Sequence, residues 1–171
     1  MSLRHALLGL LVDHPASGYD LLKTFDTSLA NVWPATQSQL YGELTKLADA
    51  GLIVVSEQGP RGRKEYTLAD SGLAELRRWL TETEPQRTRS DVLLRVFFLG
   101  VLTPQQAHHY LDTQAAHATK LNAELKALDA GVDWDDGDLS VYGRIALEYG
   151  QRFSAMQRDW ANWALTQVRS R

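Results

Sequence analysis

The chain has 171 residues, of which 44% are hydrophobic and 23% are charged, and its formal net charge is −3. This composition is ordinary for a soluble protein of one or two small domains. Because the chain has no cysteine, disulfides, thiolate metal sites and cysteine nucleophiles are excluded. The apolar stretch 7–12 is too short to span a membrane, so we expect a buried helix there and a cytoplasmic protein.

The first part of the chain predicts two short helices. Apolar residues recur at helical spacing over residues 2–13 and again over 19–29. The intervening segment 14–18 contains Pro15 and Gly18, which predict a break between the two helices.

A third helix is predicted from Thr36 onward. Thr36 and Gln39 have the spacing of a capping box, in which each side chain bonds to the other residue's backbone. Gly51 is expected to end this helix, because glycine readily adopts the left-handed conformation found after helix ends. An apolar stripe runs along one side of the helix and contains Leu40, Leu44, Leu47 and Ala48.

The segment that follows predicts a β-hairpin. Residues 52–56 are rich in β-formers, 58–62 resemble a turn, and 64–68 alternate in the manner of a returning strand. Three helices followed by a hairpin is the order of a winged helix-turn-helix. In that fold the third helix enters the major groove of DNA, and the hairpin, or wing, contacts the backbone.

The outward face of the third helix carries polar side chains that suit DNA. Glutamine can read a base edge, and serine and tyrosine can donate to phosphates. The alternative is a solvated polar face on which Tyr41 is half packed against a neighbour. The residues expected to point outward are Gln37, Ser38, Tyr41 and Thr45.

The turn of the hairpin is the densest basic run in the chain. Arg61, Arg63 and Lys64 lie beside two glycines and a proline, so we expect them on a tight turn that contacts phosphates. A solubilising charged turn is the alternative. The basic turn and the polar helix face occur at the separation that a DNA-binding domain requires, and together they favour DNA.

The second half of the chain predicts helices only. The polar segment 81–89 is the expected boundary between a DNA-binding domain at 1–82 and a helical dimerisation domain at 90–171. Thr103 and Pro104 predict the start of a long helix. Each of the last two helices carries an apolar seam with coiled-coil-like spacing, and these seams predict a homodimer. The predicted dimerisation residues are Leu111, Leu121, Leu125, Tyr149, Phe153, Met156, Trp160 and Trp163.

Several motifs of the first half resemble those of the PadR family of transcriptional regulators. They are Ala6–Leu11, Gly18–Leu21, Trp33–Tyr41 with Leu44, Leu47 with Gly51–Ile53, Arg63–Leu68, and Gly72. The resemblance implies a homodimer that binds a palindromic double-stranded DNA operator, usually as a repressor, and a small aromatic effector. It places Tyr19 at the DNA backbone. With Thr36 at the helix start, the predicted DNA-binding set is Tyr19, Thr36, Gln37, Ser38, Gln39, Tyr41, Arg61, Arg63 and Lys64.

Other patterns predict no enzyme, metal or cofactor. The five histidines lack the spacing of metal ligands and are expected at the surface. No nucleophile elbow or phosphate-binding loop occurs. The acidic run from Asp133 to Asp138 is interpreted as a helix–helix turn rather than a calcium loop. The aromatic residues of the last helix offer a ligand pocket as the alternative to dimer packing.

The predicted fold class is therefore mainly α, with a small β-hairpin. It comprises an N-terminal winged helix-turn-helix and a C-terminal helical dimerisation domain. The alternative function is a winged-helix module that binds a protein partner and no DNA.

Overall fold

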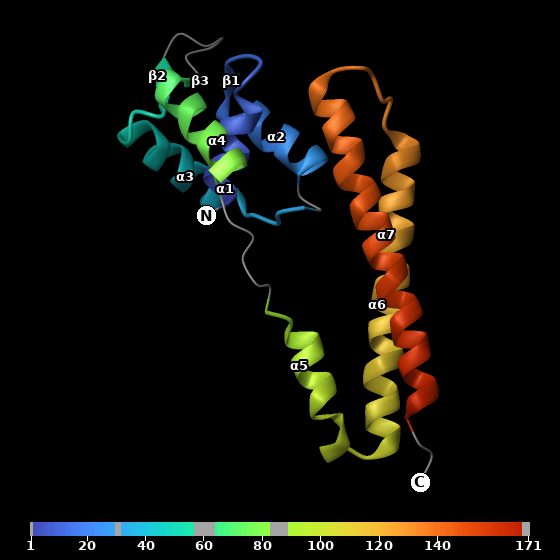
Figure 1. Ribbon diagram of the computed structural model, residues 1–171. Helices are drawn as coiled ribbons and strands as arrows, with labels where there is room; N and C mark the ends of the chain where they lie inside the picture. Colours follow the sequence, from blue (N-terminus) through green and yellow to red (C-terminus); the bar gives the residue numbers. More distant parts are fainter. Residues whose placement is uncertain (1, 30–31, 57–63, 83–88, 169–171) are drawn as a thin grey trace. The chain divides into compact units, whose positions relative to one another are not determined.

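The computed structural model describes residues 2–29, 32–56, 64–82 and 89–168. Contacts divide the chain into two compact units, Met1–Gln86 and Arg87–Arg171, which we describe separately. The first unit (Figure 1) contains α1 (Ser2–Leu10), β1 (Ala16–Ser17), α2 (Gly18–Ser28), α3 (Gln37–Asp49), β2 (Ile53–Ser56), β3 (Glu65–Leu68) and α4 (Asp70–Glu82). The second contains α5 (Asp91–Phe97), the short 3-10 helix η2 (Leu99–Val101), α6 (Pro104–Gly131) and α7 (Asp138–Gln167).

Local sequence signals set the ends of the principal helices. The Thr36 hydroxyl accepts a bond from the Gln39 backbone N–H, and the Gln39 side chain accepts one from the Thr36 N–H, so the predicted capping box is confirmed. Gly51 follows α3 with a φ of 66°, the left-handed conformation that the sequence predicts there. Thr103 and Gln106 form the corresponding box at the start of α6.

A three-stranded antiparallel sheet in the order β1-β3-β2 replaces the predicted two-stranded hairpin. The β2–β3 pair matches the prediction, with Val55 opposite Tyr66. The additional strand β1 pairs Ala16 with Tyr66 and Ser17 with Glu65. A strand of two residues cannot show an alternating pattern, so the sequence indicated only a break between helices at this point.

The core of the first unit lies where α1, α2 and α3 meet the sheet. Phe25, Leu7 and Leu8 are fully buried at its centre, and Leu40, Leu44 and Leu47 enter it from α3. The apolar stripe predicted for the third helix is therefore the side by which α3 is attached to the domain.

His5 is buried, which makes the prediction of surface histidines wrong at this position. Its ring stacks on Trp79 of α4 with centroids 4.5 Å apart, and its Nε2 lies 3.6 Å from a carboxylate oxygen of Glu75. An imidazole can pack on an indole face while its nitrogen meets a polar partner. His5 therefore joins α1 to α4.

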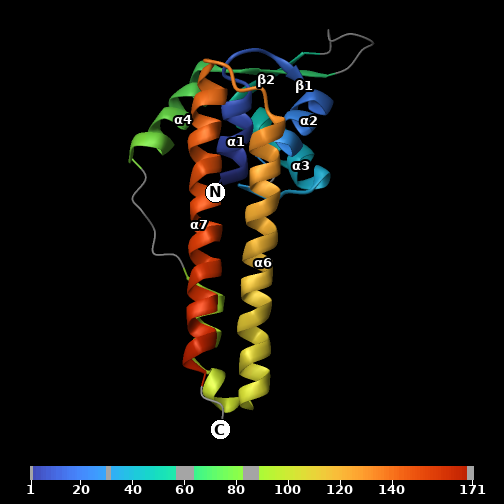
Figure 2. The ribbon, with the colours of Figure 1, turned by 90° about the vertical axis from the view of Figure 1, so that its right-hand side faces the viewer.

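The second unit is built on a hairpin of α6 and α7, which run side by side in opposite directions (Figure 2). The side chains buried between them are mostly small, so the two backbones approach closely. From α6 these are Ala107, Leu111, Ala115, Ala118, Asn122 and Leu125; from α7 they are Leu147, Ser154, Ala161 and Ala164.

A polar layer crosses the middle of this hairpin. The amide of Asn122 donates to the Gln151 carbonyl at 2.8 Å and to the Ser154 hydroxyl at 3.0 Å. The Ser154 hydroxyl lies 2.8 Å from the Gly150 carbonyl, to which it can donate. Because buried polar groups must find partners, this layer favours one register of α6 against α7.

Candidate nucleic-acid interface

The α3 polar face, formed by Gln37, Ser38, Tyr41 and Thr45, is exposed along its length. It lies opposite the buried Leu40 and Leu44, so the same helix is anchored on one side and free on the other. An anchored helix with an exposed polar face can enter a DNA groove without leaving its domain. The Thr45 hydroxyl donates to the Tyr41 carbonyl at 3.1 Å.

Two predicted DNA-binding side chains, those of Thr36 and Gln39, use some of their hydrogen-bonding groups to cap α3. The Gln39 side-chain oxygen accepts from the Thr36 backbone N–H at 2.8 Å and lies 3.2 Å from the Thr36 hydroxyl. The Gln39 amide nitrogen is left to donate to an acceptor such as a phosphate. Thr36 thus acts first as a helix cap, and Gln37 and Ser38 are the side chains that the cap leaves free to approach bases.

Positive charge near α3 is sparse within the described residues. Lys46 is exposed but pairs with Glu43 at 3.2 Å. Lys64 is exposed at the start of the returning wing strand. The predicted contacts Arg61 and Arg63 lie outside the described residues.

Tyr66 connects the wing to the rest of the domain. Its ring is buried in the core, and burial, followed by the neighbouring Tyr41, raises the pKa of its phenol. Tyr66 lies opposite Ala16 of β1 and Val55 of β2, so it joins the middle strand to both of its neighbours.

The start of α2 presents Tyr19 to solvent, with 59% of the residue exposed. Ser17 caps this helix by accepting from the Asp20 backbone N–H at 3.2 Å, and its hydroxyl donates to the Asp20 carboxylate at 2.6 Å. The carboxylate adds negative charge beside Tyr19, so any contact with a phosphate here is carried by the tyrosine.

Comparison with protein families covers nearly the whole chain. The transcriptional regulator PadR-like family matches residues 7–78, and the virulence activator alpha C-terminal domain matches residues 88–169. The probable transcriptional regulator Rv1176c of Mycobacterium tuberculosis is 38% identical over 137 residues, which are 75% of this chain and 72% of that protein. The chain belongs to the PadR-like family of transcriptional regulators.

A second member, the negative transcriptional regulator PadR of Bacillus subtilis, is 39% identical over 110 residues. That match covers 61% of this chain and 60% of PadR, so it spans less than two thirds of the relative.

Solved structures extend the likeness to the fold of both units. Bacillus subtilis PadR in complex with operator DNA has a TM-score of 0.80 at 28% identity and covers 99% of this chain and 100% of that one. PadR in complex with p-coumaric acid has a TM-score of 0.80 at 29% identity, covering 97% and 98%. The Vibrio cholerae virulence activator AphA has a TM-score of 0.83 at 23% identity, covering 98% of each chain, which supports the fold alone. The predicted winged helix with a helical C-terminal region is confirmed.

In this PadR-like chain, α7 carries a large apolar face that the described residues of its own unit leave exposed. Tyr149 and Phe153 stack on this face with centroids 5.9 Å apart. A helix face this apolar and this exposed marks an interaction surface. The α7 apolar face comprises Tyr142, Ile145, Tyr149, Phe153, Met156 and Trp163, which are 42–69% exposed, with the partly buried Trp160 beside them.

The predicted dimerisation residues on α6 are buried or partly buried, unlike the exposed residues of α7. Leu111 and Leu125 are buried between α6 and α7 of the same chain, at 2% and 5% exposure, and Leu121 is partly buried. Leu111 and Leu125 therefore stabilise the hairpin and offer no surface to a second chain.

A second exposed apolar surface lies on α5 and η2, and the sequence-based site prediction omitted it. Phe97 and Val101 are 86% and 83% exposed, and Leu93, Leu94 and Phe98 are exposed beside them. The sequence did contain a signal for this surface, because the apolar residues between positions 92 and 99 lie on every side of a short helix. Such a helix needs more than one apolar neighbour to be buried.

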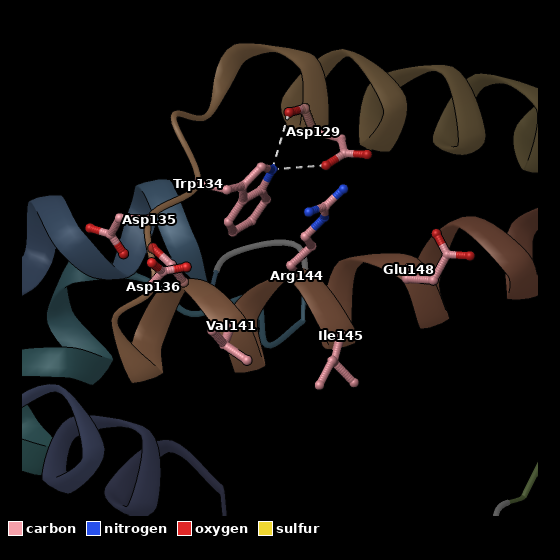
Figure 3. A pocket seen from close by; sticks show the side chains of 9 residues that line it. Asp129, Trp134, Asp135, Asp136, Val141, Arg144, Ile145 and Glu148 are labelled. Carbon is pink, nitrogen blue, oxygen red and sulfur yellow. Dashed lines mark hydrogen bonds between the residues drawn. The ribbon is translucent and has the colours of Figure 1, made fainter.

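A hollow of about 570 Å³ lies at the turn between α6 and α7 (Figure 3). Trp134 forms one wall, and its indole N–H donates to the Asp129 carboxylate at 2.9 Å. Val141 and Ile145 supply aliphatic surface. Four of the described lining residues carry carboxylates, Asp129, Asp135, Asp136 and Glu148, against the single cation Arg144.

The acidic turn is held by its own hydrogen bonds. The Ser140 side chain and the Gly137 backbone N–H donate to Asp135 and lower the pKa of that carboxyl. Within the described residues, no three potential metal ligands come together and no helix is long and apolar enough to cross a membrane.

Proposed function

We propose that this chain is a cytoplasmic, homodimeric repressor that binds a palindromic DNA operator through α3. The observation that carries the proposal is the exposed polar face of α3, opposite the side buried in the core. PadR of Bacillus subtilis, which shares the fold, has been crystallised with operator DNA.

The proposed contacts divide into two classes. Gln37 and Ser38 approach base edges, because they lie on the first turn of α3 and remain free of the cap. Tyr19, Gln39 and Tyr41 donate to the DNA backbone of the half-site, and Thr36 holds the helix start that faces it. The wing residues Arg61, Arg63 and Lys64 bind phosphates. Specificity therefore depends on two side chains and affinity on the remaining contacts.

Dimerisation supplies the second recognition helix. The α7 apolar face and the α5 surface are too large to leave in water, and burying each large side chain contributes about 1.5–3 kcal/mol. A two-fold dimer sets its recognition helices about one DNA turn apart, roughly 34 Å. Since positive charge near α3 is sparse within the described residues, useful affinity calls for two copies.

Release from DNA by a small aromatic effector completes the proposal. Support comes from the structure of PadR with p-coumaric acid and from the hollow beside Trp134. The four carboxylates of the hollow disfavour an organic acid, so a neutral or cationic aromatic molecule fits it better.

A gel-shift experiment on the chain's own promoter region tests the proposal. We expect sequence-dependent binding at micromolar protein or below that weakens as salt rises. Tyr41→Ala should weaken specific binding while leaving the melting temperature nearly unchanged. Equal retention of promoter and random DNA, or no retention at all, would favour the alternative of a protein-interaction module.

A further inference from the structure

Gly18, the first residue of α2, lies against the ring of Tyr41. A Cβ built on Gly18 would come 2.7 Å from Cε1 of Tyr41, 3.3 Å from its hydroxyl oxygen and 3.4 Å from Cζ. A contact of 2.7 Å between carbon atoms is well inside the roughly 3.5–4.0 Å of optimal packing. The edge of the tyrosine ring therefore occupies the space that any other residue at position 18 would fill.

Backbone conformation does not explain this glycine. Among the described glycines only Gly51 has a positive φ, so Gly18 adopts a conformation open to other residues. Gly18 opens a helix, where alanine is the better helix former. The missing side chain thus serves the contact with Tyr41 rather than the path of the chain.

The same contact lies where three elements of the domain meet. Gly18 directly follows β1, whose Ala16 pairs with Tyr66 of the wing strand. The pKa of the Tyr66 phenol is raised, first by burial and then by Tyr41. The Tyr41 ring therefore lies against the start of α2, directly after the strand that pairs with β3.

We infer that Gly18 is a positioning residue for DNA binding, because its lack of a side chain allows Tyr41 to stand in the α3 polar face with a fixed orientation. The inference rests on the proposed function. It makes residue 18, which contributes no side chain of its own, a determinant of operator affinity.

The expected consequence of filling this space follows from the exposure of Tyr41. Tyr41 is 38% exposed and the hydroxyl end of its ring is the part in contact, so we expect a methyl group at position 18 to push the ring toward solvent. Little apolar surface is uncovered by that movement, so the fold survives. The hydroxyl, however, leaves the place from which it donates to a phosphate.

A double-mutant cycle on the full chain tests the inference, with operator affinity measured by fluorescence anisotropy and stability by thermal unfolding. We expect Gly18→Ala to lower operator affinity about tenfold per half-site, as loss of one hydrogen bond to a charged group predicts. Tyr41→Ala should cause a similar loss. In the Tyr41→Ala background, Gly18→Ala should have no further effect, because the ring that it displaces is gone.

Gly9→Ala is the matched control, because a Cβ at that helical glycine meets nothing within 4 Å. It should retain full affinity. Full affinity in Gly18→Ala, additive losses in the double variant, or a fall in melting temperature that accounts for the loss would overturn the inference. A wild-type chain that binds no DNA would instead overturn the proposed function, so the two failures are distinguishable.

Discussion

Replacing Asn122 by aspartate should destabilise the α6–α7 hairpin in a pH-dependent way. The amide nitrogen of Asn122, a residue only 5% exposed, donates to the Gln151 carbonyl and the Ser154 hydroxyl. An ionised aspartate of nearly the same shape has no donor and would face the Gln151 carbonyl oxygen. Leaving a buried charge unpaired costs about 3–5 kcal/mol, so we expect a loss of that order at neutral pH.

The pH dependence follows from the pKa of the new carboxyl. Burial would raise its folded-state pKa above the unfolded value of about 3.9, so the loss begins as pH rises through about 3.9 and levels off above the folded pKa. Between these limits the free energy of unfolding should fall by at most about 1.4 kcal/mol per pH unit. At acidic pH the neutral carboxyl can donate to Gln151, and the variant should approach the wild type.

Thermal unfolding followed by far-ultraviolet circular dichroism over this pH range measures the effect. Asn122→Leu is the control, because it removes both donated bonds without adding charge, and Ser154 keeps its bond within α7. We expect its loss to be about 1–2 kcal/mol and independent of pH. An aspartate variant that melts with the wild type at neutral pH would refute the assignment of Asn122 as the donor in this layer.

Three further variants test the packing of α4, the α7 apolar face and the wing. Gly72→Ala should cost about 1–3 kcal/mol or more in unfolding experiments, since its Cβ would lie 2.1 Å from the Leu52 carbonyl oxygen, which is backbone and cannot swing away. Phe153→Glu combined with Trp163→Glu should convert the proposed dimer to a folded monomer in sedimentation experiments; an unchanged dimer would place the interface elsewhere. Lys64→Ala should weaken binding to all DNA sequences and reduce the salt slope of operator binding by about 0.9 per subunit; an unchanged slope would remove Lys64 from the phosphate contacts.

The sequence predicts those parts of this fold that local signals determine. The capping box of Thr36 and Gln39, the left-handed Gly51 and the start of α6 after Thr103 each depend on a few neighbouring residues. The apolar stripe of α3 was also predictable, since its period fixes which side is buried.

Features that depend on distant partners were not predictable. The strand β1 exists only because Ala16 meets Tyr66, a residue of the wing strand. His5 is buried because its ring stacks on Trp79 and its Nε2 lies near Glu75, both of which belong to α4.

On α7 the periodic pattern of the sequence is formed by large apolar residues, but the residues buried in the hairpin are mostly small. Gly150 illustrates the reason, since a Cβ there would lie 3.1 Å from Cδ1 of Leu125. How closely the two helix backbones approach decides which face of α7 is buried against α6. The sequence of one helix alone does not show how close the other helix will come.

For the candidate site, the sequence predicts which side of α3 is exposed, and the DNA contacts of that side stay a prediction. The exposed α3 face follows from periodicity, because residues opposite a buried stripe must face outward. The contribution of Gly18 could not be inferred, because it depends on the position of a ring 23 residues away in the chain.

Selection of the genomic DNA fragments that the purified chain retains is the most direct test of the central claim. We expect one enriched palindrome whose half-sites are centred about one helical turn apart, at 10–10.5 base pairs or a multiple of that spacing. Retention of fragments without any shared sequence, or half-sites whose spacing no two-fold dimer can reach, would contradict the account.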